Sequence, residues 1–357
     1  MKHVIFAFSL LALLVSPMAQ EKKTWGIWYN SYQEPYVSLQ EKSDKDLFTK
    51  HLAFFKEIGI NRVYFLVKFP TGHVFYDSKI APRYKSLDWD PFDFVVKECR
   101  RLNLEIFPYV NIFSEGDFNE KTRQYDIIGP YLEKNPEHIM VDQHGKKYGW
   151  ACPSAEAVIE YELSIIREIL TNYSVDGIQL DRIRYPDSKV CYNQSCIGLY
   201  EKKFGKKPDA ADYDWIVFRQ ELLSDFVARA YRMVKEIAPK VVFSAAVFPR
   251  PYATQFEQLQ AWPRWCQRES LDEVASMTYY QTTDPFKLYL RQNLELTPPH
   301  IPFLAGIGTF FIKDPQVVEE QISFALDRGV QGIVFFNGYH LLVEPYGAML
   351  KKFTAKK

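Results

Sequence analysis

The stretch that decides the fold of this chain is VDGIQLDRIRYP, at residues 175–186. Side chains alternate between the two faces of a β-strand. Because Ile178 and Leu180 require the apolar layer between strands and helices, we expect Gln179 and Asp181 to point to the opposite face. The stretch therefore predicts a buried parallel strand that delivers a carboxylate at its carboxyl end.

Similar apolar runs recur along the chain and alternate with longer amphipathic stretches. Near-continuous runs of Val, Ile, Phe and Ala are typical of parallel strands that are buried on both faces. The eight predicted strands are residues 24–30, 61–69, 105–113, 175–182, 241–248, 273–280, 302–310 and 331–337. The main predicted helices are residues 44–58, 91–102, 155–173, 215–237, 285–296 and 315–326.

Strands that alternate with helices form either a closed barrel or an open doubly wound sheet. No glycine-rich phosphate loop follows the first predicted strand, which disfavours the nucleotide-binding form of the open sheet. Asp90, Asp284 and Asp314 each precede a proline, as an N-cap acid does at the start of a helix. The sequence therefore predicts an α/β fold, a single (β/α)8 barrel with extended loops, over residues 20–357.

The composition restricts the partners of the chain. Its 357 residues are 47% apolar, and 44 Lys and Arg balance 44 Asp and Glu, so the positive excess of a nucleic-acid binder is absent. Residues 1–19 carry Lys2 and His3 before an apolar run that is too short to span a bilayer and fits a signal peptide. We expect an exported protein, periplasmic or secreted, without stable membrane insertion and without a nucleic-acid partner.

The five cysteines give a limited signal. Cys191 and Cys196 share a polar segment and could close a short disulfide loop, which export would permit. Cys99, Cys152 and Cys266 are expected to be small buried apolar residues. The cysteine and histidine spacing predicts no zinc site, and we expect neither a metal nor another cofactor.

Asp181 is the first candidate for catalysis. In barrels of this kind the reacting groups come from the carboxyl ends of the strands. Arg182 and Arg184 flank Asp181 and would keep it ionised, as a nucleophile or a charge stabiliser requires. An ion pair that only orders the loop explains the same residues equally well. Asp176 lies lower on the strand, where we expect a structural role.

Aromatic and polar side chains stand at nearly every predicted strand end, and this combination favours a cleft that binds a glycan. Trp28 and Tyr280 are predicted to stack on sugar rings. The residues predicted to contact hydroxyl or acetamido groups, with the two histidines also able to assist proton transfer, are Lys68, His73, Asn111, Arg184, Gln281 and His340.

The stretch at residues 175–186 also resembles the signature of a known family, the glycosyl-hydrolase-like family 10 of largely bacterial exported barrel proteins. The resemblance continues in order along most of the chain, through residues 25–28, 61–82, 90–111, 136–137, 150–161, 215, 218–219 and 244, and more weakly through 277–280. It implies a (β/α)8 barrel that hydrolyses O-glycosidic bonds of a bacterial glycan, either of the cell wall or of another polysaccharide. One position departs from the family, since Ala81 precedes Pro82 where many members carry Glu.

Most glycosidases use two carboxylates, and their separation decides the stereochemical outcome. Asp181 is the predicted first carboxylate, and Glu115, on the loop just past Asn111, is the predicted second. The competing candidates for the second position are Asp117, Asp284 and Glu344, of which the last two stand at helix starts. Two other classes of protein stay open, a barrel that binds a glycan without cleaving it and a deacetylase. The deacetylase is disfavoured because no Asp/His/His metal set is visible in the sequence.

Overall fold

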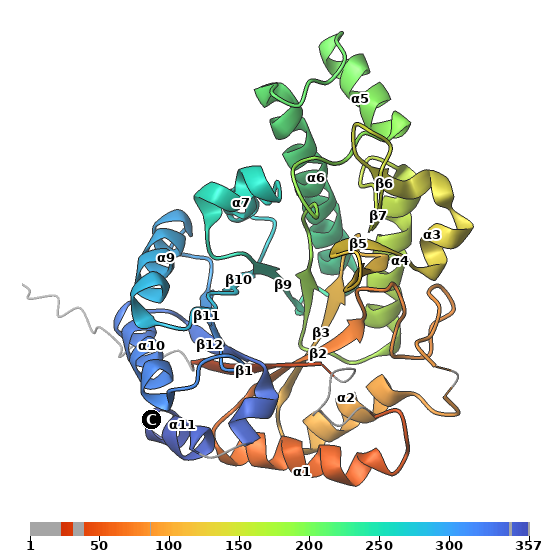
Figure 1. The fold of residues 1–357 in the computed structure, drawn as a ribbon. Helices are drawn as coiled ribbons and strands as arrows, with labels where there is room; N and C mark the ends of the chain where they lie inside the picture. The colour runs from red at the N-terminus through yellow and green to blue at the C-terminus, as the bar shows by residue number, and fades with distance from the viewer. Residues whose placement is uncertain (1–22, 31–38, 86, 343–344, 356–357) are drawn as a thin grey trace, which may run out of the picture.

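The computed structural model of the chain describes residues 23–30, 39–85, 87–342 and 345–355, and its fold is a closed parallel barrel surrounded by helices (Figure 1). The barrel closes in the order β1-β12-β11-β10-β9-β8-β3-β2, and all of its pairs are parallel. The barrel strands are β1 (Thr24–Tyr29), β2 (Arg62–Lys68), β3 (Glu105–Asn111), β8 (Gly177–Asp181), β9 (Val242–Val247), β10 (Glu273–Ser276), β11 (Phe303–Gly308) and β12 (Gly332–Phe336). The predicted (β/α)8 barrel is confirmed, and each of the eight barrel strands lies within a predicted run.

The helices of the outer ring are also close to their predicted positions. They are α1 (Asp44–Glu57), α2 (Pro91–Arg101), α4 (Glu156–Asn172), α6 (Tyr213–Ile237), α9 (Thr283–Leu296), α10 (Pro315–Asp327) and α11 (Tyr346–Thr354). Asp90 and Asp314 cap α2 and α10 as predicted, because their carboxylates accept backbone N–H groups of the first turn. The predicted cap at Asp284 is wrong: α9 begins earlier, after Thr282, and Asp284 lies within its first turn.

Four loops at the carboxyl ends of the barrel strands carry extra elements that the sequence did not reveal. Between β3 and α4 lie β4 (Gly116–Asn119), β5 (Gln124–Ile128), α3 (Pro130–Lys134), η1 (Pro136–His138), β6 (Ile139–Val141) and β7 (Lys147–Ala151). The other additions are α5 (Gln194–Phe204) after β8, α7 (Pro251–Glu257) and α8 (Trp262–Gln267) after β9, and η2 (Gly338–Leu342) after β12. The strands β4, β5, β6 and β7 form two short antiparallel sheets.

Polar side chains fill the barrel in layers. At the amino end, Arg62 Nη1 lies 2.6 Å from Glu273 Oε2, and Tyr64 donates to the same carboxylate. Higher up, Gln179 Oε1 accepts Trp28 Nε1–H at 2.6 Å, and its amide donates to Ser244 Oγ at 3.2 Å. Gln179 therefore points to the barrel axis, as strand alternation predicted, and the next inward position on β8 is Asp181.

The lower end of β8 confirms the structural role predicted for Asp176. Its Oδ2 accepts the backbone N–H of Ile106 at 2.9 Å, and its Oδ1 lies 2.8 Å from Arg100 Nη1. The carboxylate thus ties the start of β8 to β3 and to α2. Within the described residues, no helix is long and apolar enough to cross a bilayer.

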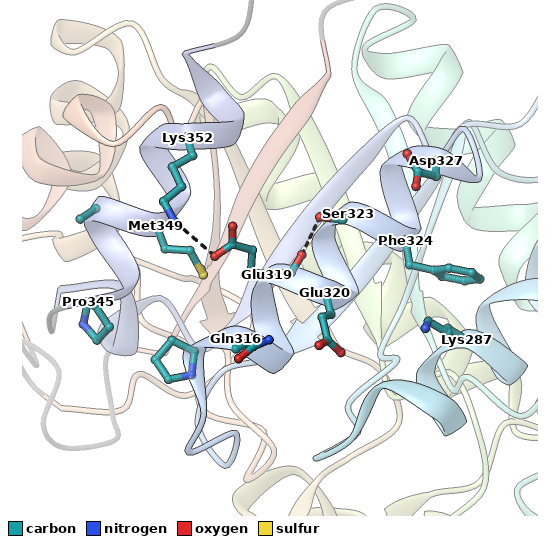
Figure 2. Close-up of a pocket in the computed structure, with 12 residues that line it drawn as sticks. Lys287, Gln316, Glu319, Glu320, Ser323, Phe324, Asp327, Pro345, Met349 and Lys352 are labelled. Atoms are coloured by element: carbon teal, nitrogen blue, oxygen red, sulfur yellow. Dashed lines mark hydrogen bonds and ion pairs between the residues drawn. The ribbon is translucent and has the colours of Figure 1, made fainter.

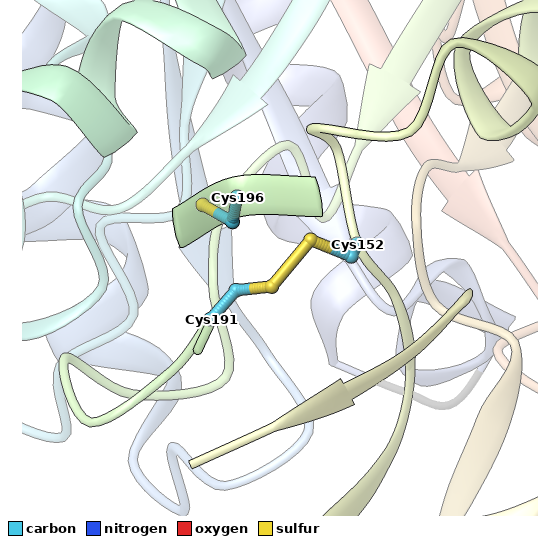
Figure 3. A group of neighbouring side chains, drawn as sticks. All are labelled: Cys152, Cys191 and Cys196. Atoms are coloured by element: carbon cyan, nitrogen blue, oxygen red, sulfur yellow. A yellow bond between two sulfur atoms is a disulfide. The ribbon is translucent and has the colours of Figure 1, made fainter. Parts of the chain in front are cut away.

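A disulfide joins two of the extended loops, and its pairing differs from the predicted one. Cys191 pairs with Cys152, with their Cα atoms 6.5 Å apart, and the predicted bridge from Cys191 to Cys196 is not formed (Figure 3). The reason is tertiary: Tyr192 donates its backbone N–H to Val141, which brings the loop after β8 against β6 and β7. Cys196 lies on α5 and stays a buried thiol, as Cys99 and Cys266 do.

Candidate active site

A cavity of about 230 Å³ opens at the carboxyl ends of the barrel strands. Seven of the eight barrel strands, or the residues that directly follow them, contribute to its wall. The lining residues are Trp28, Asn30, Leu66, Pro70, Tyr109, Asn111, Asp181, Arg182, Ala246, Met277, Tyr279 and Phe336. The cavity lies where barrel enzymes carry their reacting groups, and we refer to it as the mouth pocket.

Asp181 is the last residue of β8 and lines the mouth pocket. Its Oδ1 accepts the backbone N–H of Arg182 at 2.5 Å and lies 3.3 Å from Arg184 Nη1. The side chain keeps 20% of its surface exposed, so a ligand in the pocket can reach it. Asp181 therefore occupies the position that strand alternation predicted, with its carboxylate toward the pocket.

Two arginines that follow Asp181 closely in the sequence, Arg182 and Arg184, belong to the site. Arg184 pairs with Asp181, and its guanidinium lies 4.4 Å from the centre of the Phe248 ring. Burial lowers the pKa of Arg184, Asp181 acts in the opposite direction, and the positive charge of Arg182 adds to the lowering. Arg182 lines the pocket, and its Nη1 donates to Ser114 Oγ at 3.3 Å. Arg184 contacts Asp181 but does not itself line the pocket, so its contact with a glycan stays a prediction.

Trp28 and Asn111 are the other predicted residues that line the pocket. The Trp28 indole is fixed by its hydrogen bond to Gln179 and lies edge-on to Tyr279. Asn111 pairs with Asp181 in the β3–β8 register, and its amide donates to the Lys68 carbonyl at 2.9 Å. The structure therefore brings Trp28, Asn111 and Asp181 together on one wall of the cavity.

Lys68, predicted to contact the glycan, and Glu115, predicted as the second carboxylate, do not line the pocket. Both side chains are fully buried, and Lys68 Nζ lies 2.6 Å from Glu115 Oε1 and 2.8 Å from Glu162 Oε1. Glu162 belongs to α4 and also accepts the backbone N–H of Phe113. We call Lys68, Glu115 and Glu162 the sealed cluster. It fastens β2 and the loop after β3 to the outer helix.

The sealed cluster contains two carboxylates and one ammonium group. Burial raises the pKa of Glu115 to about 7, and the negative charge of Glu162 acts in the same direction, whereas Lys68 opposes them. The space around the Glu115 carboxylate is closed, because a Cβ atom added at Gly72 would lie 2.0 Å from Glu115 Oε2. Glu115 as the second catalytic carboxylate stays a prediction that no observation of the pocket supports.

The remaining predicted contacts also lie outside the pocket lining. Tyr280 stacks on Tyr289 of α9 with ring centres 5.3 Å apart, and the preceding residue, Tyr279, lines the pocket in its place. β10 ends at Ser276, four residues before the predicted end, so strand alternation no longer orients Tyr280 or the exposed Gln281.

The two histidines are held by neighbours on their own loops. His73 Nδ1 lies 3.0 Å from Thr71 Oγ1, and His340 Nδ1 lies 2.8 Å from Asn337 Oδ1. Burial lowers the pKa of both imidazoles. Neither ring lines the mouth pocket.

The other acidic candidates do not line the pocket either. Asp117 lies on β4, and Asp284 is exposed on the first turn of α9. Glu344 lies outside the described residues. Among the described residues that line the mouth pocket, Asp181 is the single carboxylate.

Several residues that line the mouth pocket were not predicted from the sequence. Tyr109 is two positions before Asn111 on β3, so strand alternation alone places both on the inner face. Asn30 directly follows β1 and Phe336 is the last residue of β12, and neither was predicted individually to line the cleft. Their assignment needed the exact strand ends, which an apolar run does not define.

A larger hollow of about 820 Å³ lies on the outside of the barrel, between α9, α10 and α11 (Figure 2). Charged and polar side chains dominate its wall, among them Glu319, Glu320 and Lys352. Lys352 Nζ lies 3.4 Å from Glu319 Oε2 across the groove. No barrel strand contributes to this groove, so its size does not make it the candidate active site.

Within the described part of the chain, one group of side chains has atoms close enough together to hold a metal ion. The Sγ atoms of Cys152, Cys191 and Cys196 lie within 4.8 Å of one another (Figure 3). Two of these atoms form the disulfide, so the group as it stands is not a set of three free thiolates.

Comparisons of the sequence with known proteins agree on one family. A family model described as glycosyl hydrolase-like 10 matches residues 23–323. The chain is 24% identical over 260 residues to glycosyl hydrolase DigH of Escherichia coli strain K12, which covers 64% of this chain and 56% of that protein. It is 22% identical over 269 residues to glycosyl hydrolase YngK of Bacillus subtilis, covering 68% of this chain and 50% of that protein. The chain thus spans about half the length of these two relatives.

Solved structures share the barrel. The glycoside hydrolase domain of PgaB (BpsB) from Bordetella bronchiseptica superposes with a TM-score of 0.72 at 12% identity, covering 94% of this chain and 99% of that chain. An alpha-L-fucosidase from Paenibacillus thiaminolyticus superposes with a TM-score of 0.67 at 13% identity, covering 94% of this chain and 49% of that chain. At these identities the likeness shows the fold alone, a TIM barrel of the kind found in glycosidases.

Proposed function

The chain belongs to the glycosyl hydrolase-like 10 family, and from this premise we propose that it hydrolyses O-glycosidic bonds of a bacterial polysaccharide, with Asp181 as a reacting carboxylate. The observation that carries the proposal is the position of Asp181, inward at the end of β8 and on the wall of the mouth pocket. Barrel enzymes place their reacting groups at such strand ends.

The residues around Asp181 support binding of a sugar. Trp28, Tyr109 and Tyr279 offer aromatic surfaces on which the C–H faces of a sugar ring can pack. Asn111 and Asn30 add amide groups suited to hydroxyl contacts. A carboxylate in this setting can attack the anomeric carbon or take a proton from the water that does so.

A second candidate function is a barrel that binds a glycan without cleaving it. The specific observation in its favour is that Asp181 is the single carboxylate among the described lining residues. Most glycosidases need a second carboxylate, and the predicted partner, Glu115, is fully buried against Lys68. Ala81 supports the same alternative, because many members of the family carry Glu at this position.

We also propose that the protein acts outside the cytoplasm. The predicted signal peptide, residues 1–19, lies outside the described residues. The Cys152–Cys191 disulfide supports the proposal, because disulfides form and persist mainly in oxidising compartments. A cell-wall glycan or an exopolysaccharide is then the substrate within reach of the enzyme.

The experiment incubates the purified protein with cell-wall glycan strands and with bacterial exopolysaccharides, and measures new reducing ends and retention of the protein on the immobilised glycan. Boiled protein is the control. We expect reducing ends to accumulate on one of these substrates. Retention without new reducing ends supports the non-catalytic barrel, and the absence of both results contradicts the two functions together.

A further inference from the structure

The charges at the mouth pocket do not balance. Asp181 supplies one carboxylate, whereas Arg182 and Arg184 supply two guanidinium groups. Asp181 pairs with Arg184 at 3.3 Å, and in the described part of the chain Arg182 has no acidic partner within ion-pair distance. Counted over the described residues, the pocket therefore carries about one positive charge in excess.

Neutral groups hold the Arg182 guanidinium in place. Its Nη1 donates to Ser114 Oγ, and the same hydroxyl donates to the Pro70 carbonyl at 2.9 Å. The Trp150 ring lies 5.7 Å from the guanidinium carbon on another side. Because Pro70 also lines the pocket, these contacts hold the guanidinium at the pocket edge formed by the loops after β2 and β3.

The Arg182 guanidinium cannot neutralise its own positive charge. Arginine does not lose its proton in proteins, and a partly desolvated cation without a counter-charge is costly. The lowered pKa of Arg184, to which the charge of Arg182 contributes, is consistent with an excess of positive charge. An anionic group of a bound ligand would remove the excess.

We infer that Arg182 binds a carboxylate carried by an acidic sugar of the substrate, which makes it a specificity-determining residue. The inference rests on the proposed function and names its substrate class. A carboxylate has one negative charge, which matches the excess, whereas a phosphate monoester carries between one and a half and two. The planar fork of arginine also fits the two carboxylate oxygens in a bidentate pair.

Acidic sugars present this carboxylate in two ways, on C5 of a uronic acid or on an ether-linked group such as lactyl. The experiment therefore has two arms, an oligosaccharide of each kind, each compared with its own carboxyl-reduced alcohol. Calorimetry measures the binding of every oligosaccharide to the full chain. For wild type we expect the acid to bind about tenfold more tightly than its alcohol in one arm, and that arm identifies the source.

Three variants test whether Arg182 causes the preference. Arg182→Gln should reduce the acid-to-alcohol ratio to near one, and Arg182→Lys should keep part of it through charge alone. Lys189→Gln removes one exposed positive charge from the same loop and should leave the ratio unchanged. Thermal unfolding of each variant establishes that it is folded before binding is compared.

Equal affinity for acid and alcohol in both arms overturns the inference, as does failure to bind any of the four oligosaccharides. An Arg182→Gln variant that is folded and keeps the full preference overturns it too. Reducing ends are measured in the same samples. Hydrolysis without acid preference contradicts only the role of Arg182, whereas acid preference without hydrolysis contradicts only the proposed hydrolase.

Discussion

Two clusters of three charges lie close together in this molecule and have opposite compositions. The sealed cluster combines one cation, Lys68, with Glu115 and Glu162, and all three side chains are fully buried. At the mouth pocket the carboxylate of Asp181 pairs with Arg184 and keeps 20% of its surface exposed, whereas the Arg182 guanidinium donates to the neutral Ser114 hydroxyl. The sealed cluster has an excess of negative charge, and the pocket has an excess of positive charge.

The two regions differ in how the excess can be removed. A carboxylate can take up a proton, and burial beside Glu162 raises the pKa of Glu115 to about 7 so that it can do so. A guanidinium cannot lose its proton, so the excess at the mouth is removed by an anion from outside. The comparison indicates a structural role for the sealed cluster and a binding role for the pocket.

The largest expected effect comes from Asp181→Asn, which replaces the carboxylate at the pocket and keeps the side-chain size. If Asp181 reacts with the substrate, the rate of glycan cleavage falls on the order of 10³-fold. The Asn oxygen can still accept the Arg182 N–H, so the free energy of unfolding falls by no more than about 2 kcal/mol. Reducing-end release and thermal unfolding measure the two quantities.

Asp187→Asn is the matched control, because Asp187 follows on the same loop but does not line the pocket. It should retain cleavage. A wild-type rate for Asp181→Asn would remove Asp181 from the proposed chemistry.

Lys68→Met should give the largest loss of stability, because it removes the only cation of the sealed cluster and leaves two carboxylates buried together. Breaking a buried ion pair by removing one partner costs about 3–5 kcal/mol. Urea unfolding of the variant measures the loss. Lys50→Met, at an exposed position of α1, should change stability by no more than about 0.5 kcal/mol. Similar small changes in both variants would contradict the structural role of the cluster.

Glu115 should make the stability of the protein depend on pH. Its pKa rises from an ordinary 4.5 to about 7 in the folded protein, so the folded state binds a proton that the unfolded state releases between these values. The contribution is fully present below pH 4.5 and is lost as the pH rises through 7. It amounts to roughly 3 kcal/mol at most.

Urea unfolding at several pH values, for wild type and Glu115→Gln, tests this expectation. The difference in stability between the two proteins should change over that pH window, because the amide does not titrate. A difference that stays constant from pH 4.5 to 7.5 would show that Glu115 does not take up the proton.

The smallest effect is expected from Ser114→Ala, at the residue that lies between the two regions. Its hydroxyl accepts from Arg182 and donates to the Pro70 carbonyl, so its removal should cost about 1 kcal/mol of stability and weaken acid-sugar binding a few-fold. Calorimetry and unfolding measure both. Ser323→Ala on α10, in the outer groove, should leave acid-sugar binding unchanged. Unchanged binding in Ser114→Ala would show that Arg182 is positioned by other contacts.

The barrel could be predicted because buried parallel strands have a local signal. Each strand is a short apolar run, and alternation on β8 was enough to orient Gln179 and Asp181. Strand alternation does not orient Tyr280, because β10 ends at Ser276, four residues earlier. Short strands such as β4 and β6 have no comparable run and were missed.

The sequence contains no comparable local pattern that predicts contacts between distant segments. Glu115 was predicted as the second catalytic carboxylate, because nothing near it in the sequence shows that Lys68 and Glu162, 94 residues apart, enclose it. The sequence offered Cys196 as a possible partner for Cys191, whereas the packing of two loops brings Cys152, 39 residues away, to Cys191.

The sequence by itself determined the barrel and the arrival of Asp181 at its mouth, because the two-residue period of a strand and the run of buried apolar residues are local properties. Only the tertiary structure decided which charges are sealed and which remain open to a ligand. That outcome depends on side chains from β2, α4 and the loops after β3 and β8, which meet only when the barrel closes.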